Sequence, residues 1–153
     1  MTQGTSDRKK VDILVVEDNS SDAELTARAL KNNNPADRLF IVKDGEEALE
    51  FLFSHGRYSD SSSRCCPKVI FLDLKLPGMR GADVLREIKV NEQTKMIPVV
   101  IMSSSADEKD IRECFLLGAN SYIVKPVDFG KYMKTIQNAG SYWIMYNRTP
   151  SGK

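Results

Sequence analysis

Acidic, hydroxyl and basic side chains follow directly after several short apolar runs of this sequence. Glu17 and Asp18 follow the first run, Asp73 the third, Ser103 the fourth and Lys125 the fifth. Carboxylates that share a pocket raise one another's pKa unless a cation relieves the repulsion. Mg²⁺ is a suitable cation, because it prefers a few carboxylates together with waters and phosphate oxygens. If these five residues converge, they suit phosphoryl transfer.

Each residue then has a distinct role in that chemistry. A carboxylate such as Asp73 can act as a nucleophile and form an acyl phosphate. Glu17 and Asp18 would hold Mg²⁺, while Ser103 and Lys125 would contact the phosphoryl oxygens, since phosphoryl transfer depends mainly on positioning and charge neutralisation. Taken singly, each has a simpler explanation as a helix-start residue, a loop hydroxyl or a solvated charge. Their recurrence at successive run ends favours one shared site.

The apolar runs predict the strands that position these residues. They are rich in β-branched and aromatic residues, and most are apolar throughout, which indicates burial on both faces of a parallel sheet. Segments of helical spacing alternate with them, which predicts an α/β fold with five strands and five helices. The carboxyl ends of such strands form the ligand-binding edge. The five runs are Ile13–Val16, Leu39–Val42, Val69–Leu72, Val99–Met102 and Tyr122–Val124.

Three of the expected helices show interpretable patterns. Ser21 to Glu24 reads as a capping box at a helix start. The helix from about Asp107 and the last helix each carry apolar residues at helical spacing, so each is expected to pack one face against the core. The first face comprises Ile111, Cys114, Phe115 and Gly118, and the second Phe129, Met133, Ile136, Gly140 and Trp143.

Length and charge limit the remaining possibilities. A chain of 153 residues fits one domain. With 22 basic and 21 acidic residues it has no global field that would attract nucleic acid or an anionic membrane. No apolar run approaches the length of a membrane span. We expect a cytoplasmic protein with a disordered arm at 1–10, one domain at 11–146 and a polar tail at 147–153.

The cysteines and one long loop suggest no further chemistry. A strain-free disulfide between the adjacent Cys65 and Cys66 is improbable, and their spacing does not suggest a zinc site. Cys114 reads as a small buried residue, with a redox sensor as the less favoured alternative. The serine-rich stretch 55–67 lacks periodicity and is expected to be a surface loop.

Four segments together resemble the receiver domains of bacterial response regulators. They are ILVVEDN, VIFLDLKLPGMRG, PVVIMSSS and YIVKP, and the similarity covers about residues 11 to 146. The resemblance implies a flavodoxin-like, doubly wound sheet of five parallel strands in the order 2-1-3-4-5. It also implies that Asp73 is the phosphorylated residue. By position, Glu17 and Asp18 resemble the acidic pair that binds the metal with Asp73, and the backbone carbonyl of Lys75 would be a further ligand.

The resemblance also implies a switch. Ser103 matches the switch hydroxyl, Lys125 the phosphate-contacting lysine, and Tyr122 the aromatic residue whose ring rotates on activation. The Lys125–Pro126 peptide bond is usually cis in this family, a form that only an X–Pro bond tolerates easily. The chain would then be a phosphoacceptor that catalyses its own phosphorylation and dephosphorylation, rather than an enzyme.

Partners follow from the same resemblance. A sensor histidine kinase would donate the phosphoryl group. The layout is similar to response regulators paired with cyanobacterial phytochrome kinases, so a phytochrome-type kinase is expected. No DNA-binding motif is present, so a downstream protein would receive the signal. A homodimer through the fourth helix, fifth strand and fifth helix is expected. Ordinary packing and a homodimer interface are both open for the aromatic residues and methionine on the outer faces of the last helix: Tyr132, Tyr142, Met145 and Tyr146.

Three other classes compete with this interpretation. An aspartyl-phosphate phosphatase also places a carboxylate after a strand, but its motif has a second acid two residues later, where this chain has Lys75. A flavin-binding electron carrier shares the fold, yet the charge of Glu17 and Asp18 would repel a flavin phosphate. A receiver-like scaffold that takes no phosphate would not need the full set of pocket residues.

Overall fold

The computed structural model describes residues 11–33, 38–59 and 66–150, so the predicted arm at 1–10, Cys65 and the last residues of the tail lie outside the described residues. Five strands form one parallel sheet in the order β2-β1-β3-β4-β5. Their bounds are β1 Ile13–Val16, β2 Leu39–Val42, β3 Val69–Asp73, β4 Val99–Ser103 and β5 Ser121–Val124. The predicted runs and the implied strand order are therefore confirmed.

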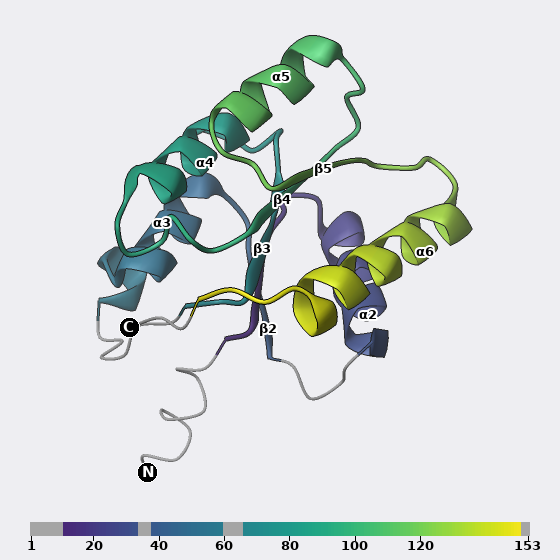
Figure 1. Ribbon diagram of the computed structural model, residues 1–153, viewed down its shortest axis with the longest axis horizontal. Helices are drawn as coiled ribbons and strands as arrows, with labels where there is room; N and C mark the ends of the chain where they lie inside the picture. The colour runs from purple at the N-terminus through teal and green to yellow at the C-terminus, as the bar shows by residue number, and fades with distance from the viewer. Residues whose placement is uncertain (1–10, 34–37, 60–65, 151–153) are drawn as a thin grey trace.

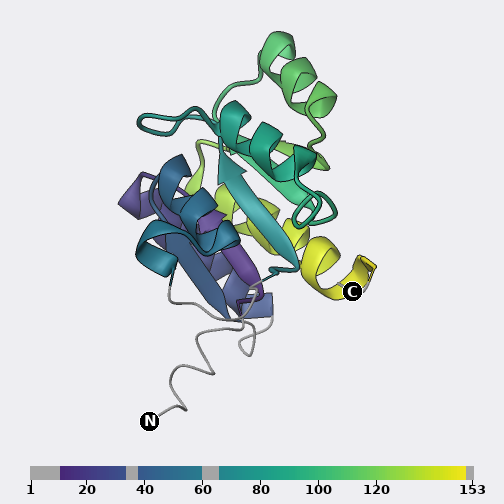
Figure 2. The same cartoon turned by 90° about the vertical axis from the view of Figure 1, so that its left-hand side faces the viewer.

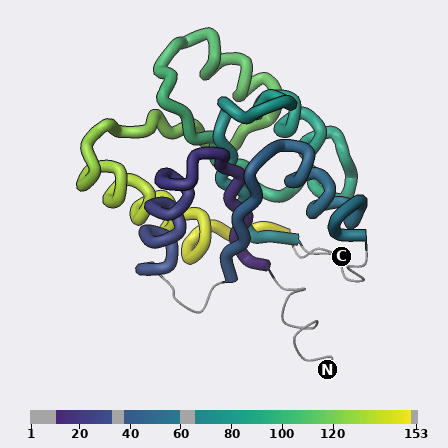
Figure 3. Tube along the Cα trace, turned by 180° about the vertical axis from the view of Figure 1, so that it is seen from behind, coloured from purple at the N-terminus to yellow at the C-terminus, as the bar shows by residue number. Residues whose placement is uncertain are grey.

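Helices cover both faces of the sheet. α2 and α6 lie on one face, and α3, α4 and α5 on the other (Figure 1). Seen from the left-hand side of Figure 1, α3 and α4 lie in front of the strands and α5 lies above them (Figure 2). Seen from behind, α2 and α6 lie side by side (Figure 3). The bounds are α2 Ser20–Asn33, α3 Gly45–Phe53, α4 Gly81–Val90, α5 Glu108–Leu116 and α6 Phe129–Gly140; a 3₁₀ turn spans Gly56–Tyr58 and a π-helical turn spans Ser141–Tyr146.

Side chains alternate between two cores because successive strand residues point to opposite faces. Leu14 and Val16 of β1 pack under α3, α4 and α5. Ile13 and Val15 pack under α2 and α6. Burial on both faces explains why the strands are apolar throughout. No helix in the described part of the chain is long and apolar enough to cross a bilayer.

The start of α2 differs from the expected capping box. Asn19 caps this helix, because its Oδ1 accepts the backbone N–H of Asp22 at 2.9 Å. Asn is as good a cap as Ser, and it comes first along the chain, so the helix begins at Ser20. The correction places Asp22 in the first turn, next to the acidic residues that follow β1.

The core stripes of α5 and α6 are also partly wrong. Phe115 and Phe129 were expected in the core, but 50% and 60% of their surfaces are exposed. Tyr132 was placed on an outer face, yet it is buried and its hydroxyl lies 3.1 Å from the Thr26 hydroxyl. The buried stripe of the last helix is instead Tyr132, Ile136, Gly140 and Ile144, one residue in four.

Candidate functional site

One ammonium group joins three carboxylates at the carboxyl edge of the sheet. Lys125 Nζ donates to Glu17 Oε1 at 2.9 Å, to Asp22 Oδ2 at 3.0 Å and to Asp73 Oδ2 at 3.2 Å. A lysine ammonium has three N–H donors, so these contacts use all of them. Three of the predicted site residues therefore meet, together with one that was not predicted.

The sheet register brings these groups together. Glu17 directly follows β1, and Asp73 is the last residue of β3, the strand beside it. Lys125 directly follows β5, and its backbone N–H donates to the Ser103 carbonyl at the end of β4 at 2.7 Å. Because the strands are parallel and end together, four distant parts of the chain meet at one point.

The charges of this cluster are buried, so they must compensate one another. The side chains of Glu17, Asp73 and Lys125 are 4%, 9% and 11% exposed. Burial and the neighbouring Asp73 raise the pKa of Glu17 to about 7, although Lys125 partly offsets this. Burial alone would lower the pKa of Lys125, but its bonds to the carboxylates outweigh burial and raise that pKa above its usual value. The ammonium remains charged and holds the acids together.

The loop after β3 orients Asp73. Its Oδ1 accepts the backbone N–H of Lys75 at 3.2 Å, while Oδ2 faces Lys125. The backbone N–H of Gly81, the first residue of α4, donates to the Leu74 carbonyl at 2.9 Å and closes the loop. The Lys75 residue itself is exposed. Asp73 is thus held by backbone on one side and by charge on the other.

The two predicted switch residues meet at a third residue. Ser103 is buried, and its Oγ accepts the backbone N–H of Ser105 at 3.0 Å. The Tyr122 hydroxyl donates to the Ser105 carbonyl at 2.9 Å. The expected cis bond at Lys125–Pro126 is wrong, because every peptide bond in the described residues is trans. The trans form is the cheaper one for X–Pro, and with it Lys125 already reaches its three partners.

The predicted metal ligands are suitable in kind. Glu17, Asp18 and Asp73 supply the carboxylate oxygens that Mg²⁺ prefers. Within the described residues, however, no three acidic, histidine or cysteine side chains stand ready to hold a metal ion. The ammonium of Lys125 contacts both Glu17 and Asp73, and Asp18 is exposed. A divalent cation fits this donor set if it replaces the ammonium between the carboxylates.

Asp22 is the member of the cluster that sequence reasoning missed. It lies in the first turn of α2, the helix that follows Glu17 and Asp18 along the chain. Its side chain is 31% exposed, and it pairs with Lys125 from the α2 side. The signal was the acid in the first turn, which the capping-box interpretation had explained as a helix-start residue.

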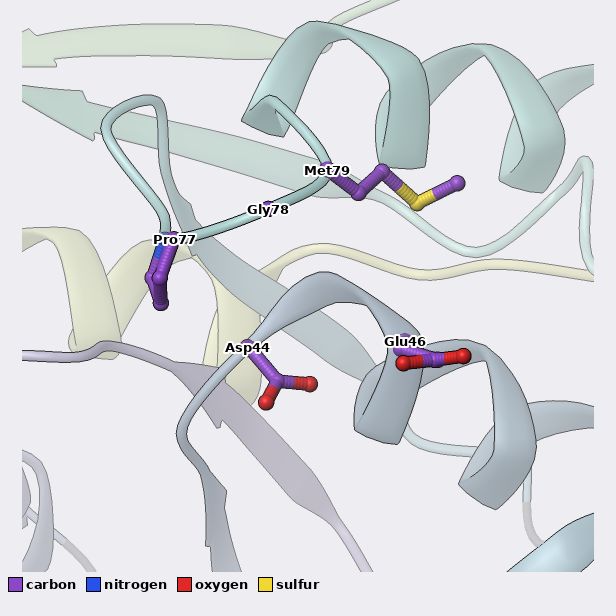
Figure 4. Close-up of a pocket in the computed structure, with 5 residues that line it drawn as sticks. All are labelled: Asp44, Glu46, Pro77, Gly78 and Met79. Carbon is purple, nitrogen blue, oxygen red and sulfur yellow. The ribbon is translucent and has the colours of Figure 1, made fainter.

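A separate hollow is lined by residues outside this cluster. Its volume is about 520 Å³, and it lies between the start of α3 and the β3–α4 loop (Figure 4). Asp44 and Glu46 line one side, and Pro77, Gly78 and Met79 the other. The Asp44 carboxylate accepts the Glu47 N–H at 2.8 Å as the cap of α3. None of the predicted site residues lines this hollow.

The fold and the site together define a receiver-type module, in which a buried carboxylate at the end of the central strand is paired with a lysine. The family model for the response regulator receiver domain matches residues 13–137. This chain belongs to the response regulator receiver domain family.

Three relatives illustrate the range of this family. Response regulator Rcp1 of Synechocystis sp. is 37% identical over 132 residues, which cover 86% of this chain and 88% of Rcp1; the structure of its Mn²⁺-bound form gives a TM-score of 0.84. The phosphorylated cyanobacterial phytochrome response regulator RcpA is 36% identical, with a TM-score of 0.85 over 93% of this chain and 99% of RcpA. A probable methanogenesis regulatory protein of Methanothrix harundinacea, FilR2, is 36% identical over 90% of this chain and 86% of its own length.

Proposed function

We propose that this chain accepts a phosphoryl group on Asp73 from a sensor histidine kinase, in a Mg²⁺-dependent reaction, and signals by a change of conformation to a protein partner. The observation that supports this most directly is the pairing of the buried Asp73 carboxylate with Lys125. A carboxylate held in this way has one oxygen against a backbone amide and the other beside a cation. The phosphoryl group would find charge compensation at the second oxygen.

The residues divide the work as follows. Asp73 supplies the attacking oxygen: its O–P bond forms as the N–P bond of the kinase phosphohistidine breaks, and the imidazole is the leaving group. Lys125 exchanges its contact with Asp73 for a phosphoryl oxygen, and the Ser103 hydroxyl donates to another. Glu17 and Asp18, with Asp73 and the Lys75 carbonyl, would hold a divalent cation. When bound, that cation would neutralise charge on the phosphoryl group; a Mn²⁺-bound form of the relative Rcp1 is known, which supports a divalent cation here.

A phosphoryl group also supplies the switch. It brings roughly two negative charges and three acceptor oxygens, which draw Ser103 and Lys125 toward Asp73. Tyr122 follows, because its hydroxyl bonds to the loop that carries Ser103. The chain then acts as a phosphoacceptor that promotes its own phosphorylation and dephosphorylation.

The first experiment is phosphorylation by acetyl phosphate, followed by intact mass. We expect wild type to gain the mass of one phosphoryl group with Mg²⁺ and none with EDTA, and Asp73→Asn to gain none in either case. Asp44→Asn is the matched control, because Asp44 caps α3 outside the cluster. No gain for wild type, or an equal gain for Asp73→Asn, would refute the proposal.

We propose a phytochrome-type kinase as the donor, in the cytoplasm. The support is the similarity to RcpA, which is described as a cyanobacterial phytochrome response regulator. FilR2, equally similar in sequence, is described as a methanogenesis regulator, so the kinase is best tested directly. The test compares the rates at which phosphorylated kinases transfer their phosphoryl group to this chain. Transfer within seconds from a phytochrome kinase, with slower transfer from unrelated kinases, supports this partner. Faster transfer from unrelated kinases excludes it.

A homodimer through α5, β5 and α6 is a further part of the proposal. β5 is an edge strand, and large apolar residues on these elements and on the loop between β5 and α6 are exposed: Phe115, Leu116, Val124, Val127 and Phe129. Exposed apolar residues that gather on neighbouring elements mark interaction sites. We expect Phe115→Glu and Phe129→Glu to weaken the dimer by at least about tenfold in sedimentation. Val90→Glu, on α4 and 66% exposed, serves as the control. A monomeric wild type, or unchanged variants, would contradict this interface.

A further inference from the structure

Every hydrogen-bonding group of Ser105 is engaged in the loop between β4 and α5. Its N–H donates to Ser103 Oγ at 3.0 Å, and its carbonyl accepts from the Tyr122 hydroxyl at 2.9 Å. Its own hydroxyl donates to Asp110 Oδ2 at 2.6 Å and accepts the N–H of Asp107 at 3.1 Å. One residue therefore links the switch hydroxyl, the switch aromatic and the start of α5.

The bond from Ser105 to Asp110 is the one that leaves the loop and reaches into the helix. Its short length is typical of a hydroxyl that donates to a carboxylate, which is stronger than a bond between neutral groups. Asp110 lies in the first turn of α5 and is partly buried. The hydrogen bond to Asp110 therefore connects the Ser105 side chain to the N-terminal end of α5.

Ser103 depends on this arrangement. Its Oγ is the atom that would bind a phosphoryl oxygen, yet here it accepts the N–H of Ser105. If Ser103 turns toward Asp73, either this bond breaks or Ser105 moves with it. Ser105 moves only if its hydroxyl leaves Asp110 or if the start of α5 follows.

The helix can respond, because its attachment to the core is slight. Cys114 is the one fully buried residue of α5. The helix lies at the end of the sheet next to the edge strand β5 (Figure 1). An element with few buried side chains is among the first to move.

We propose that Asp110 is a positioning residue that, through the Ser105 hydroxyl, holds the β4–α5 loop and the Ser103 hydroxyl in the resting arrangement, and so lowers the affinity of the pocket for a phosphoryl group. This inference rests on the proposed function. A contact that exists only in the resting state must break before a ligand can bind to the other state. The binding free energy of that ligand is therefore reduced by the free energy of the contact.

Beryllofluoride with Mg²⁺ is the probe, since it mimics a phosphoryl group on a carboxylate and is not hydrolysed at the site. By titration calorimetry, Asp110→Ala and Ser105→Ala should each bind it about fivefold more tightly than wild type, the usual net contribution of one hydrogen bond. The double variant should gain no more than Ser105→Ala, because that variant already removes the bond to Asp110. Glu108→Ala is the control: it removes an exposed acid from the same first turn and should bind as wild type does.

A second measurement needs no phosphoryl analogue. In EDTA, the amides of Ser105 and Asp107 should exchange with deuterium about fivefold faster in Asp110→Ala than in wild type or Glu108→Ala. Unchanged amide exchange in Asp110→Ala would overturn the role of Asp110. So would equal affinities for beryllofluoride in the variants and in wild type, provided that wild type binds it. A wild type that never binds beryllofluoride would refute the proposed function instead, and exchange alone would then decide whether the tether exists.

Discussion

Lys125→Met is expected to destabilise the protein by about 3 kcal/mol at pH 8, because removal of one partner leaves buried charges uncompensated. The three carboxylates on this ammonium, Glu17, Asp22 and Asp73, would then face one another without a cation. Met keeps most of the length and volume of the lysine stem, so the loss reports charge rather than packing. Urea unfolding in EDTA measures it.

The same variant should show a characteristic dependence on pH. The folded-state pKa of Glu17 is raised to about 7, above its unfolded value, so folding favours the protonated form. The cost of ionising Glu17 therefore appears as the pH rises from about 4.5 and is complete above about 7. Without Lys125 this cost is larger. The difference in unfolding free energy between Lys125→Met and wild type should be smaller at pH 5 than at pH 8.

Two comparisons make the result decisive. Lys75→Met removes an exposed lysine from the same edge of the sheet and should change stability by less than about 0.5 kcal/mol. Mg²⁺ should stabilise Lys125→Met more than wild type, because the cation no longer competes with the ammonium. If Lys125→Met instead matches Lys75→Met at pH 8, the ammonium does not neutralise the cluster.

The sheet and most of the site were accessible from sequence for one physical reason. A strand buried on both faces must be apolar throughout, so the first polar residue after each run marks the point where the strand leaves the core. Glu17, Asp73 and Lys125 stand at such points, and parallel strands place these points at a common edge. Run ends therefore predict spatial neighbours across long stretches of chain.

The misses arise where one side chain depends on a distant partner. Tyr132 is buried because its hydroxyl meets Thr26, which is remote in sequence and gives a buried tyrosine the partner it needs. Asp22 joins the site because Lys125 reaches it across the pocket. The role of Ser105 depends on Asp110 and Tyr122 together. Local periodicity carries no information on such pairings, and helical stripes assigned from hydropathy alone shift by one position.

Gly81→Ala is expected to destabilise the protein by about 3 kcal/mol, the upper end of the usual range for overpacking, because its neighbours are rigid. A Cβ at this position would overlap the Asp73 carbonyl oxygen and approach Leu74 Cα at 2.6 Å. Both are backbone atoms of the strand end that positions the acceptor carboxylate, so neither can turn aside as a flexible side chain would. Relief requires α4 to move away from β3, which also breaks the bond from Gly81 N–H to Leu74.

Gly78, in the loop that leads into Gly81, provides the matched comparison. Its φ is +75°, a conformation that costs a residue with a Cβ about 1–2 kcal/mol, but there is open space around it. Gly78→Ala should therefore lose less stability than Gly81→Ala and should still take up phosphate from acetyl phosphate. Gly81→Ala should lose more stability and should also lose phosphorylation, because any shift at Leu74 moves Asp73 away from Lys125. Urea unfolding measures the loss of stability and intact mass the loss of phosphorylation. Equal losses in the two variants would show that the backbone conformation of the glycines, rather than the close approach of Gly81 to β3, explains the requirement for glycine.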